Sequence, residues 1–201
     1  MKILRTPDEC FDNLEDYPFE PNYIDLEHDD QTLRMHYLDE NSESEEIVLL
    51  MHGEPTWSYL YRKIIPILAS NGKRVIAPDL IGFGKSDKPS SREDYSYANH
   101  IMWVETLIKK LDLKNITFFA QDWGGLIGLR LLAKYPDLYD GLVVSNSGLP
   151  VGSGATEGFM QWLEFSQIVE DFDCGKIVNQ GSLKQLNDCL LYTSPSPRDS
   201  V

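Results

Sequence analysis

The stretch that decides the fold is residues 116–125, with the sequence ITFFAQDWGG. Its first five residues form a mainly apolar run, which is typical of a strand buried on both faces of a parallel sheet. Small residues then flank Asp122, and the apolar run at 126–133 predicts a helix directly after the strand. Similar apolar runs predict three further strands of the same sheet, at 47–51, 74–78 and 141–145.

Helical patterns between these strands predict how the sheet is covered. Apolar side chains recur at helical spacing over 57–69, 97–111 and 159–169. Strands that alternate with helices favour an α/β fold, with a mostly parallel sheet and helices on both faces. Two shorter runs, 23–26 and 33–38, predict an antiparallel hairpin at the edge. Ligands of such sheets bind beyond the carboxyl ends of the strands. The loops there begin at His52, Asp79, Gln121 and Asn146.

Asp122 lies where a sharp strand-to-helix turn would present a nucleophile. The turn resembles the G-x-S-x-G elbow, which needs small residues because the backbones approach closely. Here Ala120 and Gly124 flank the turn, and Asp122 replaces the serine. A carboxylate is ionised at neutral pH and can displace a good leaving group from saturated carbon, which leaves an ester of the enzyme. The alternative is that Asp122 only caps the N-terminus of the helix, a common role for aspartate.

The loop at 52–55, His-Gly-Glu-Pro, should lie beside this turn. One of its backbone N–H groups, together with that of Trp123, can form an anion hole. His52 is interpreted as a hydrogen-bonded support for the loop rather than as a catalytic group. An indole N–H donates a hydrogen bond and accepts none, so Trp123 and Trp162 facing each other would suit a soft monatomic anion.

Composition disfavours several classes of function. The 201 residues carry 18 Lys and Arg against 32 Asp and Glu, and the resulting net charge of −14 repels nucleic acid and anionic membranes. The three cysteines show neither a metal-binding spacing nor a disulfide framework, so we expect no metal and a cytoplasmic location. The N-terminal residues lack the pattern of a secretory signal, and no apolar run approaches the ~18 residues that cross a bilayer. No pattern indicates the oligomeric state.

Three motifs in sequence order resemble the haloalkane dehalogenases of the α/β-hydrolase superfamily. They are HGEPTWSYLYRK at 52–63, GFGKSDKP at 82–89 and QDWGG at 121–125. The resemblance covers about residues 23–178, and GFMQW at 158–162 is similar to the cap segment that carries the family's second halide-binding tryptophan. It implies an α/β-hydrolase fold with a partial helical cap, and no cofactor.

The resemblance also implies roles for individual residues. Asp122 would attack the carbon that carries the halogen of a small neutral haloalkane, and the halide would leave between the indoles of Trp123 and Trp162. Water would then hydrolyse the ester, while the backbone N–H groups of Glu54 and Trp123 hold the oxyanion. In this family a histidine, oriented by an acid, activates that water.

The sequence departs from the family at this last step. The family order is nucleophile, acid and then histidine. All histidines here precede Asp122, namely His28, His36, His52 and His100. We therefore expect a C-terminally truncated dehalogenase that lacks the catalytic histidine and the third acid, and in which the alkyl ester accumulates. Its expected parts are the N-terminal part of the core at 1–147, the start of the cap at 148–188 and a disordered or non-native tail at 189–201.

Two other functions stay open at this level. An epoxide hydrolase of the same superfamily shares the aspartate nucleophile but protonates a ring oxygen with cap tyrosines. Tyr192 is the one tyrosine in the cap segment and tail, whereas Trp162 and Glu54 favour the dehalogenase. A chain without a late histidine could also be a non-catalytic fragment or a small-molecule binding module.

Overall fold

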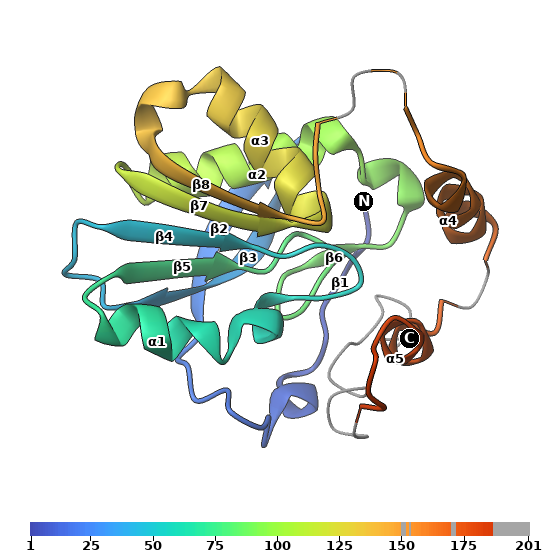
Figure 1. Ribbon diagram of the computed structural model, residues 1–201, viewed down its shortest axis with the longest axis horizontal. Coiled ribbons are helices and arrows are strands. Elements are labelled where there is room, and N and C mark those ends of the chain that lie inside the picture. The colour runs from blue at the N-terminus through green and yellow to red at the C-terminus, as the bar shows by residue number, and fades with distance from the viewer. Residues whose placement is uncertain (150–151, 153, 170–171, 187–201) are drawn as a thin grey trace.

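The computed structural model describes residues 1–149, 152, 154–169 and 172–186, which build an α/β fold around a six-stranded sheet (Figure 1). The strand order is β2 (Asn22–His28), β3 (Gln31–Glu40), β5 (Arg74–Pro78), β4 (Ile47–Met51), β7 (Ile116–Gln121) and β8 (Tyr139–Ser145). The last four strands are parallel to one another, whereas β3 is antiparallel to β2 and to β5. The expected parallel sheet with an antiparallel edge hairpin is confirmed.

Helices cover both faces of this sheet. They are α1 (Ile64–Ser70), α2 (Tyr97–Lys110) and α3 (Asp122–Lys134). In Figure 1, α2 and α3 lie on one face and α1 lies on the other. Short 3-10 turns join the elements at Asp8–Phe11, Ser58–Tyr61, Arg92–Asp94 and Pro136–Leu138.

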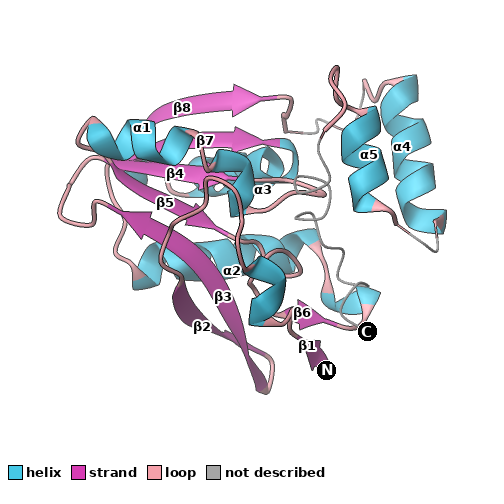
Figure 2. Ribbon diagram, turned by 90° about the horizontal axis from the view of Figure 1, so that it is seen from below, coloured by secondary structure: helices cyan, strands magenta, loops and turns pink. Residues whose placement is uncertain are grey.

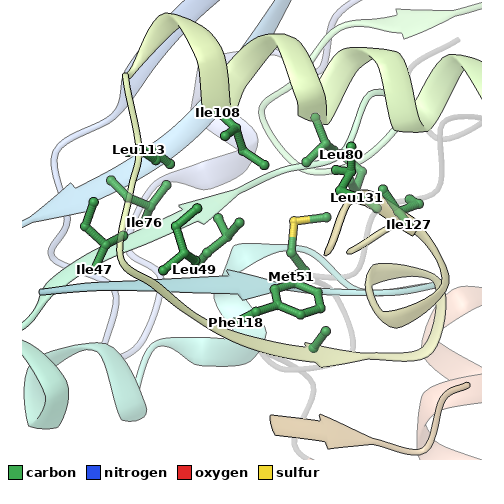
Figure 3. Packing of buried hydrophobic residues seen from close by; sticks show 13 residues of the cluster. Ile47, Leu49, Met51, Ile76, Leu80, Ile108, Leu113, Phe118, Ile127 and Leu131 are labelled. Carbon is green, nitrogen blue, oxygen red and sulfur yellow. The ribbon is translucent and has the colours of Figure 1, made fainter. Parts of the chain in front are cut away.

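Strand β4 shows why an apolar run without alternation forms a central strand. Ile47, Leu49 and Met51 belong to the core against α2 and α3 (Figure 3). Val48 and Leu50 belong to the core beneath α1. Because successive side chains of a strand point to opposite faces, both faces of β4 must be apolar when helices cover both. The two cores fix the carboxyl end of β4, where the candidate site begins.

The helix expected over 57–69 is divided in the structure. A 3-10 turn at Ser58–Tyr61 comes first, and α1 begins only at Ile64. Pro66 explains the late start, because proline is tolerated in the first turn of a helix and breaks its interior. An α-helix that began at 57 would carry Pro66 in its third turn.

Helix α3 begins earlier than the predicted start at 126. Its first residue is Asp122, directly after β7. Gly124 and Gly125 lie in its first turn, and glycine has a low helix propensity, so an apolar pattern alone misses this turn. The strand-to-helix connection is therefore even sharper than predicted.

Two helices follow the sheet, α4 (Glu157–Ile168) and α5 (Cys174–Gln180), beyond the carboxyl ends of the strands (Figure 2). α4 confirms the helix expected over 159–169, and Thr156 caps it by accepting the N–H of Phe159. α5 was missed, although Asp173 caps it in the same way. None of the α4 residues is buried. The division into core and cap remains a prediction, and the expected tail at 189–201 lies outside the described residues.

The N-terminal segment is tied to the loop after β5. The short strand β1 (Ile3–Leu4) pairs antiparallel with β6 (Lys88–Pro89). The Arg5 guanidinium donates hydrogen bonds from Nε and Nη2 to the two carboxylate oxygens of Asp87, at 2.7 and 3.0 Å. These contacts bring the start of the chain to the end of the sheet that carries the site. None of the helices described could span a membrane, since each is too short or too polar.

Candidate active site

Asp122 lies at a strained connection between β7 and α3. Its φ angle is +53°, in the left-handed region that residues with a Cβ rarely adopt. Gln121 occupies the N-cap position of α3, and Asp122 is the first helical residue. The Asp122 carboxylate accepts a hydrogen bond from another loop instead of from its own helix. The helix-cap alternative for Asp122 is therefore not supported, and the predicted elbow is present.

Two glycines permit the close approach that this elbow needs. A Cβ on Gly53 would lie 2.2 Å from Asp122 Oδ1, inside van der Waals contact. A Cβ on Gly124 would lie 2.3 Å from the carbonyl oxygen of Met51, at the end of β4. A side chain at either position would push the nucleophile loop and the β4 loop apart.

The peptide group that joins Gly53 and Glu54 faces Asp122. Its N–H, on Glu54, donates to Asp122 Oδ1 at 2.8 Å. Its carbonyl, on Gly53, accepts from His52 Nδ1 at 3.0 Å and from the Thr56 hydroxyl and N–H at 2.8 and 2.9 Å. Since the carbonyl is held by three donors, the N–H has a fixed direction, as a preorganised oxyanion donor requires.

His52 supports this loop and has no nitrogen left for catalysis. Its side chain is fully buried, and Nε2 accepts the N–H of Leu80 at 2.9 Å. Because Leu80 must donate, the neutral ring carries its proton on Nδ1, which donates to Gly53. Burial lowers the pKa of His52, against the raising effect of the Asp79 charge. The interpretation of His52 as a support is confirmed.

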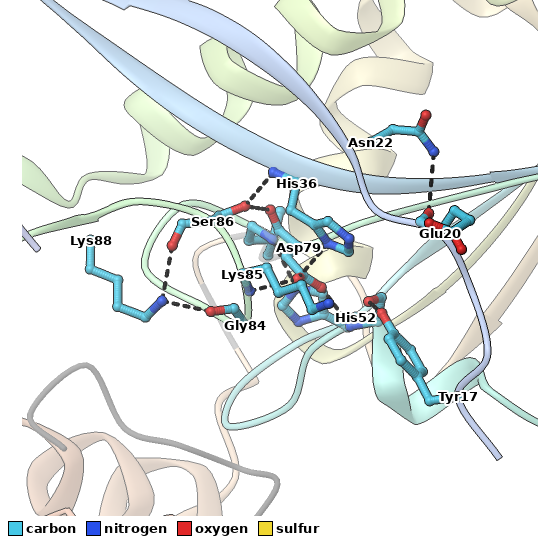
Figure 4. Close-up of polar contacts among 12 residues, drawn as sticks. Tyr17, Glu20, Asn22, His36, His52, Asp79, Gly84, Lys85, Ser86 and Lys88 are labelled. Carbon is cyan, nitrogen blue, oxygen red and sulfur yellow. Dashed lines mark hydrogen bonds and ion pairs between the residues drawn. The ribbon is translucent and has the colours of Figure 1, made fainter. Parts of the chain in front are cut away.

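Asp79 holds the segment that follows this loop, through the N–H of Ser58. Its buried carboxylate accepts Ser58 N–H at 2.8 Å, His36 Nδ1 at 2.7 Å and Lys85 N–H at 2.9 Å (Figure 4). Burial opposes the ionised form, but the His36 interaction and the other donors outweigh it and lower the pKa of Asp79 to about 2. Sequence reasoning named Asp79 only as the start of a loop. The sequence signal that could have identified Asp79 is a single acidic residue directly after a buried strand.

A cavity of about 570 Å³ opens beside the elbow. Glu54 and Trp123, the residues whose N–H groups form the predicted anion hole, both line it. Asp122 precedes Trp123 and is hydrogen-bonded to Glu54, so it is adjacent to the cavity without being part of its wall. The remaining wall is largely apolar, with Leu80, Phe83, Ile127, Val169 and Phe172 among its residues. Such a cavity suits a small apolar molecule.

Comparison with known proteins agrees with this geometry. Residues 46–170 match the family described as alpha/beta hydrolase fold. A haloalkane dehalogenase of Psychrobacter cryohalolentis is 50% identical over 204 residues, which cover 100% of this chain and 67% of that protein. The chain belongs to the haloalkane dehalogenase family. The structure of haloalkane dehalogenase DpaA from Paraglaciecola agarilytica NO2, described as tetrameric, has a TM-score of 0.90 at 41% identity, over 98% of this chain and 67% of that one.

Haloalkane dehalogenases are hydrolases, so the substrate class is a halogenated alkane together with water. The chain spans about two thirds of the length of these relatives. Epoxide hydrolases are more distant: VrEH1 from Vigna radiata is 29% identical with a TM-score of 0.57, over 65% of this chain and 40% of that one. The dehalogenase interpretation is therefore preferred over the epoxide hydrolase.

The two tryptophans predicted to hold halide lie in different surroundings. Trp123 lines the cavity, with its ring 6.3 Å from that of Tyr97. Trp162, on α4, packs against Phe165 at 5.8 Å and Phe172 at 6.1 Å between ring centroids. Phe172 lines the cavity, but Trp162 is not among the described residues that do so. The dehalogenase thus has one indole at the cavity, and the pairing of the two remains a prediction.

The side chains of Glu54 and His100 are titratable groups of the cavity wall whose shifted pKa values were not predicted. Burial raises the pKa of the Glu54 carboxyl, the charge of Asp122 raises it further, and Arg92 opposes both. Burial lowers the pKa of His100 to about 4, with a smaller contribution from His52. The Nδ1 atom of His100 is buried without a hydrogen-bond partner in the described part of the chain. Across that same part, no three His, Cys, Asp or Glu side chains are arranged to hold a metal ion.

Proposed function

We propose that Asp122 is the nucleophile of this haloalkane dehalogenase. A carboxylate oxygen attacks the carbon that carries the halogen, the carbon–halogen bond breaks, and the halide leaves with the electron pair. The product is an alkyl ester of Asp122. The observation that carries the proposal is the 2.8 Å hydrogen bond from Glu54 N–H to Asp122 Oδ1, at an elbow with a φ of +53°.

The other residues have roles in the same sequence of steps. The indole N–H groups of Trp123 and Trp162 receive the departing halide. The backbone N–H groups of Glu54 and Trp123 stabilise the oxyanion that forms when water attacks the ester. No cofactor takes part, because the displacement needs only an ionised carboxylate and a good leaving group.

Hydrolysis of the ester is the slow step in a polypeptide with these 201 residues. No histidine follows Asp122 in the sequence. His52 uses both ring nitrogens in hydrogen bonds, and the pKa of about 4 makes His100 a weak proton acceptor. A general base contributes ~10²–10⁴-fold to such a step. The ester therefore accumulates.

Intact-mass analysis after incubation with 1,2-dibromoethane tests both parts of this proposal. We expect the mass increment of one bromoethyl group per chain, and peptide mapping should locate the group on Asp122, where the modified peptide shows the isotope pattern of one bromine. D122N should form no adduct. D137N, which changes an exposed aspartate elsewhere, should react like the wild type.

Two results would contradict the proposal. An adduct on another residue would refute the nucleophile, and sustained bromide release by the wild type would refute the trapped ester. If bromide ions quench tryptophan fluorescence but no adduct forms, the chain is a binding module.

A further inference from the structure

The charged side chains at the cavity form an unexpected set. Lys2, Glu54 and Arg92 line it, so two cations face one carboxylate in a protein with a net charge of −14. Burial, followed by the charge of Asp122, raises the pKa of Glu54, whereas Arg92 lowers it. The charged side chains of the wall are thus two cations and one anion, which favours an anion there more than the net charge of the chain suggests.

Arg92 is held in place without being neutralised. Its Nη1 donates to the carbonyl of Gln167 at 3.0 Å and its Nη2 to that of Ser166 at 3.3 Å. Both carbonyls lie in the last turn of α4. In the described chain no carboxylate forms an ion pair with Arg92, whereas Arg5 and Arg74 each have one. A guanidinium has five N–H donors, so donors remain for another acceptor.

Arg92 also acts electrostatically on Glu54, in the loop that faces the elbow. Its charge lowers the pKa of Glu54, while that of Asp122 raises it, so Glu54 lies within electrostatic range of both groups. Trp123, next to Asp122, lines the same cavity as Arg92. A halide released at Asp122 therefore meets two groups on the same wall, the neutral indole of Trp123 and the positive charge of Arg92.

We propose that Arg92 is the cationic part of a halide-binding site in this cavity, with the indole of Trp123 as its neutral donor. The site takes chloride or bromide, and this assignment rests on the proposed function in placing halide release at Asp122. Two properties of the side chain fit the ligand. A guanidinium stays charged at every physiological pH, and it is weakly hydrated, which favours contact with a soft anion. Lys2 adds charge to the same wall.

Bromide titration of tryptophan fluorescence tests the proposal, with sodium gluconate added to hold the ionic strength constant. R92Q should raise the bromide Kd about five-fold, the size expected for a partly solvated charge. R92K keeps the charge and should stay within about two-fold of the wild type. K114Q removes the same charge from an exposed lysine that does not line the cavity, and should leave Kd unchanged. W123F should abolish most of the quenching.

The outcomes distinguish two roles of Arg92, a charge that binds halide and a hydrogen-bonded tether to α4. An unchanged Kd in R92Q overturns the proposal, and so does an equal loss in R92Q and R92K, because the tether to α4 would then be the cause. If thermal melts show that R92Q is unfolded, the salt dependence of the wild-type protein tests the proposal instead. Its bromide Kd must weaken as gluconate rises from about 20 to 300 mM, since salt screens a charge, and a constant Kd refutes the site. The adduct assay on Asp122 is independent, so the nucleophile and the halide site can fail separately.

Discussion

Gly53 sets the distance between the oxyanion donor and the nucleophile. A Cβ at this position would lie 2.2 Å from Asp122 Oδ1. In G53A the carboxylate or the loop must shift by about an ångström. We expect alkylation of Asp122 to slow by about 100-fold, because displacements of this size at a reacting group have effects of that order. The rate of adduct formation with 1,2-dibromoethane measures the change.

G148A is the matched control for this substitution. A Cβ at Gly148 would have no heavy atom within 4 Å, so the alkylation rate of Asp122 in G148A should equal that of the wild type. A G53A rate within about two-fold of the control would show that the carboxylate does not need its present position.

Single residues also show where sequence reasoning ends. Asp122 and Glu54 were predicted because their motifs are contiguous and their spacing is fixed by a sharp turn. Asp79 was not recognised as an anchor, since its partners at His36, Ser58 and Lys85 come from three separate segments. No periodicity or short motif records contacts of that kind.

Among the strands, β8 has the most large apolar side chains that are exposed. It is the last strand in the sheet order, and Leu142, Val143 and Val144 are 46, 47 and 36% exposed. A strand edge with apolar side chains on both faces favours association with other chains. We expect the 201-residue chain to self-associate as its concentration rises, and V143K to reduce this association because a lysine at a sheet edge opposes pairing. Sedimentation velocity measures it.

I67K is the control for this prediction. Ile67 on α1 is 61% exposed, so the substitution adds the same charge to an apolar surface away from the edge. Equal self-association in V143K and the wild type, or an equal reduction in both variants, would show that the edge of β8 is not responsible.

The elements were predicted best where the core imposes a pattern. All central strands and α2 follow from apolar runs or helical spacing, because they are buried on one or both faces. α5 was missed because it has only seven residues and one buried side chain, Cys174. Trp162 was assigned to the halide site from a motif, yet its ring packs on Phe165 and Phe172. The motif identified Trp162, but the neighbours of its ring depend on how α4 packs, which the motif does not specify.

At the scale of the whole molecule, the cavity joins segments that are far apart in the sequence. Its wall includes Lys2 from the start of the chain, Arg92 from the connection between β6 and α2, and Phe172 before α5. The sequence predicted the end of the sheet that would carry the site, since strand ends dictate it. It could not predict this wall, because the start of the chain reaches the site through the pairing of β1 with β6 and the contact of Arg5 with Asp87, which are distant in sequence.

The stability of the whole fold should depend on pH through His100. Its folded pKa is about 4, below the ordinary value of 6.5, because burial disfavours the charged ring. Between these values the unfolded chain binds a proton that the folded chain does not, so stability is full above about 6.5 and falls as the pH drops toward 4. His52, whose pKa burial also lowers, acts in the same direction. The folded pKa of Asp79 is lowered to about 2, so the stability that Asp79 contributes is lost only at a still lower pH.

H100F isolates the contribution of His100 to the pH dependence of stability. The substitution removes the titrating ring, and no hydrogen bond is lost at Nδ1, which is without a partner in the described chain. From pH 6.5 to 4.5 we expect the wild type to lose on the order of 2 kcal/mol more unfolding free energy than H100F. Urea unfolding at pH 8, 6.5, 5.5 and 4.5 measures the difference. Parallel pH profiles for the two proteins would mean that His100 binds protons equally well in the folded and unfolded chains, so that the cavity wall around it is open to water.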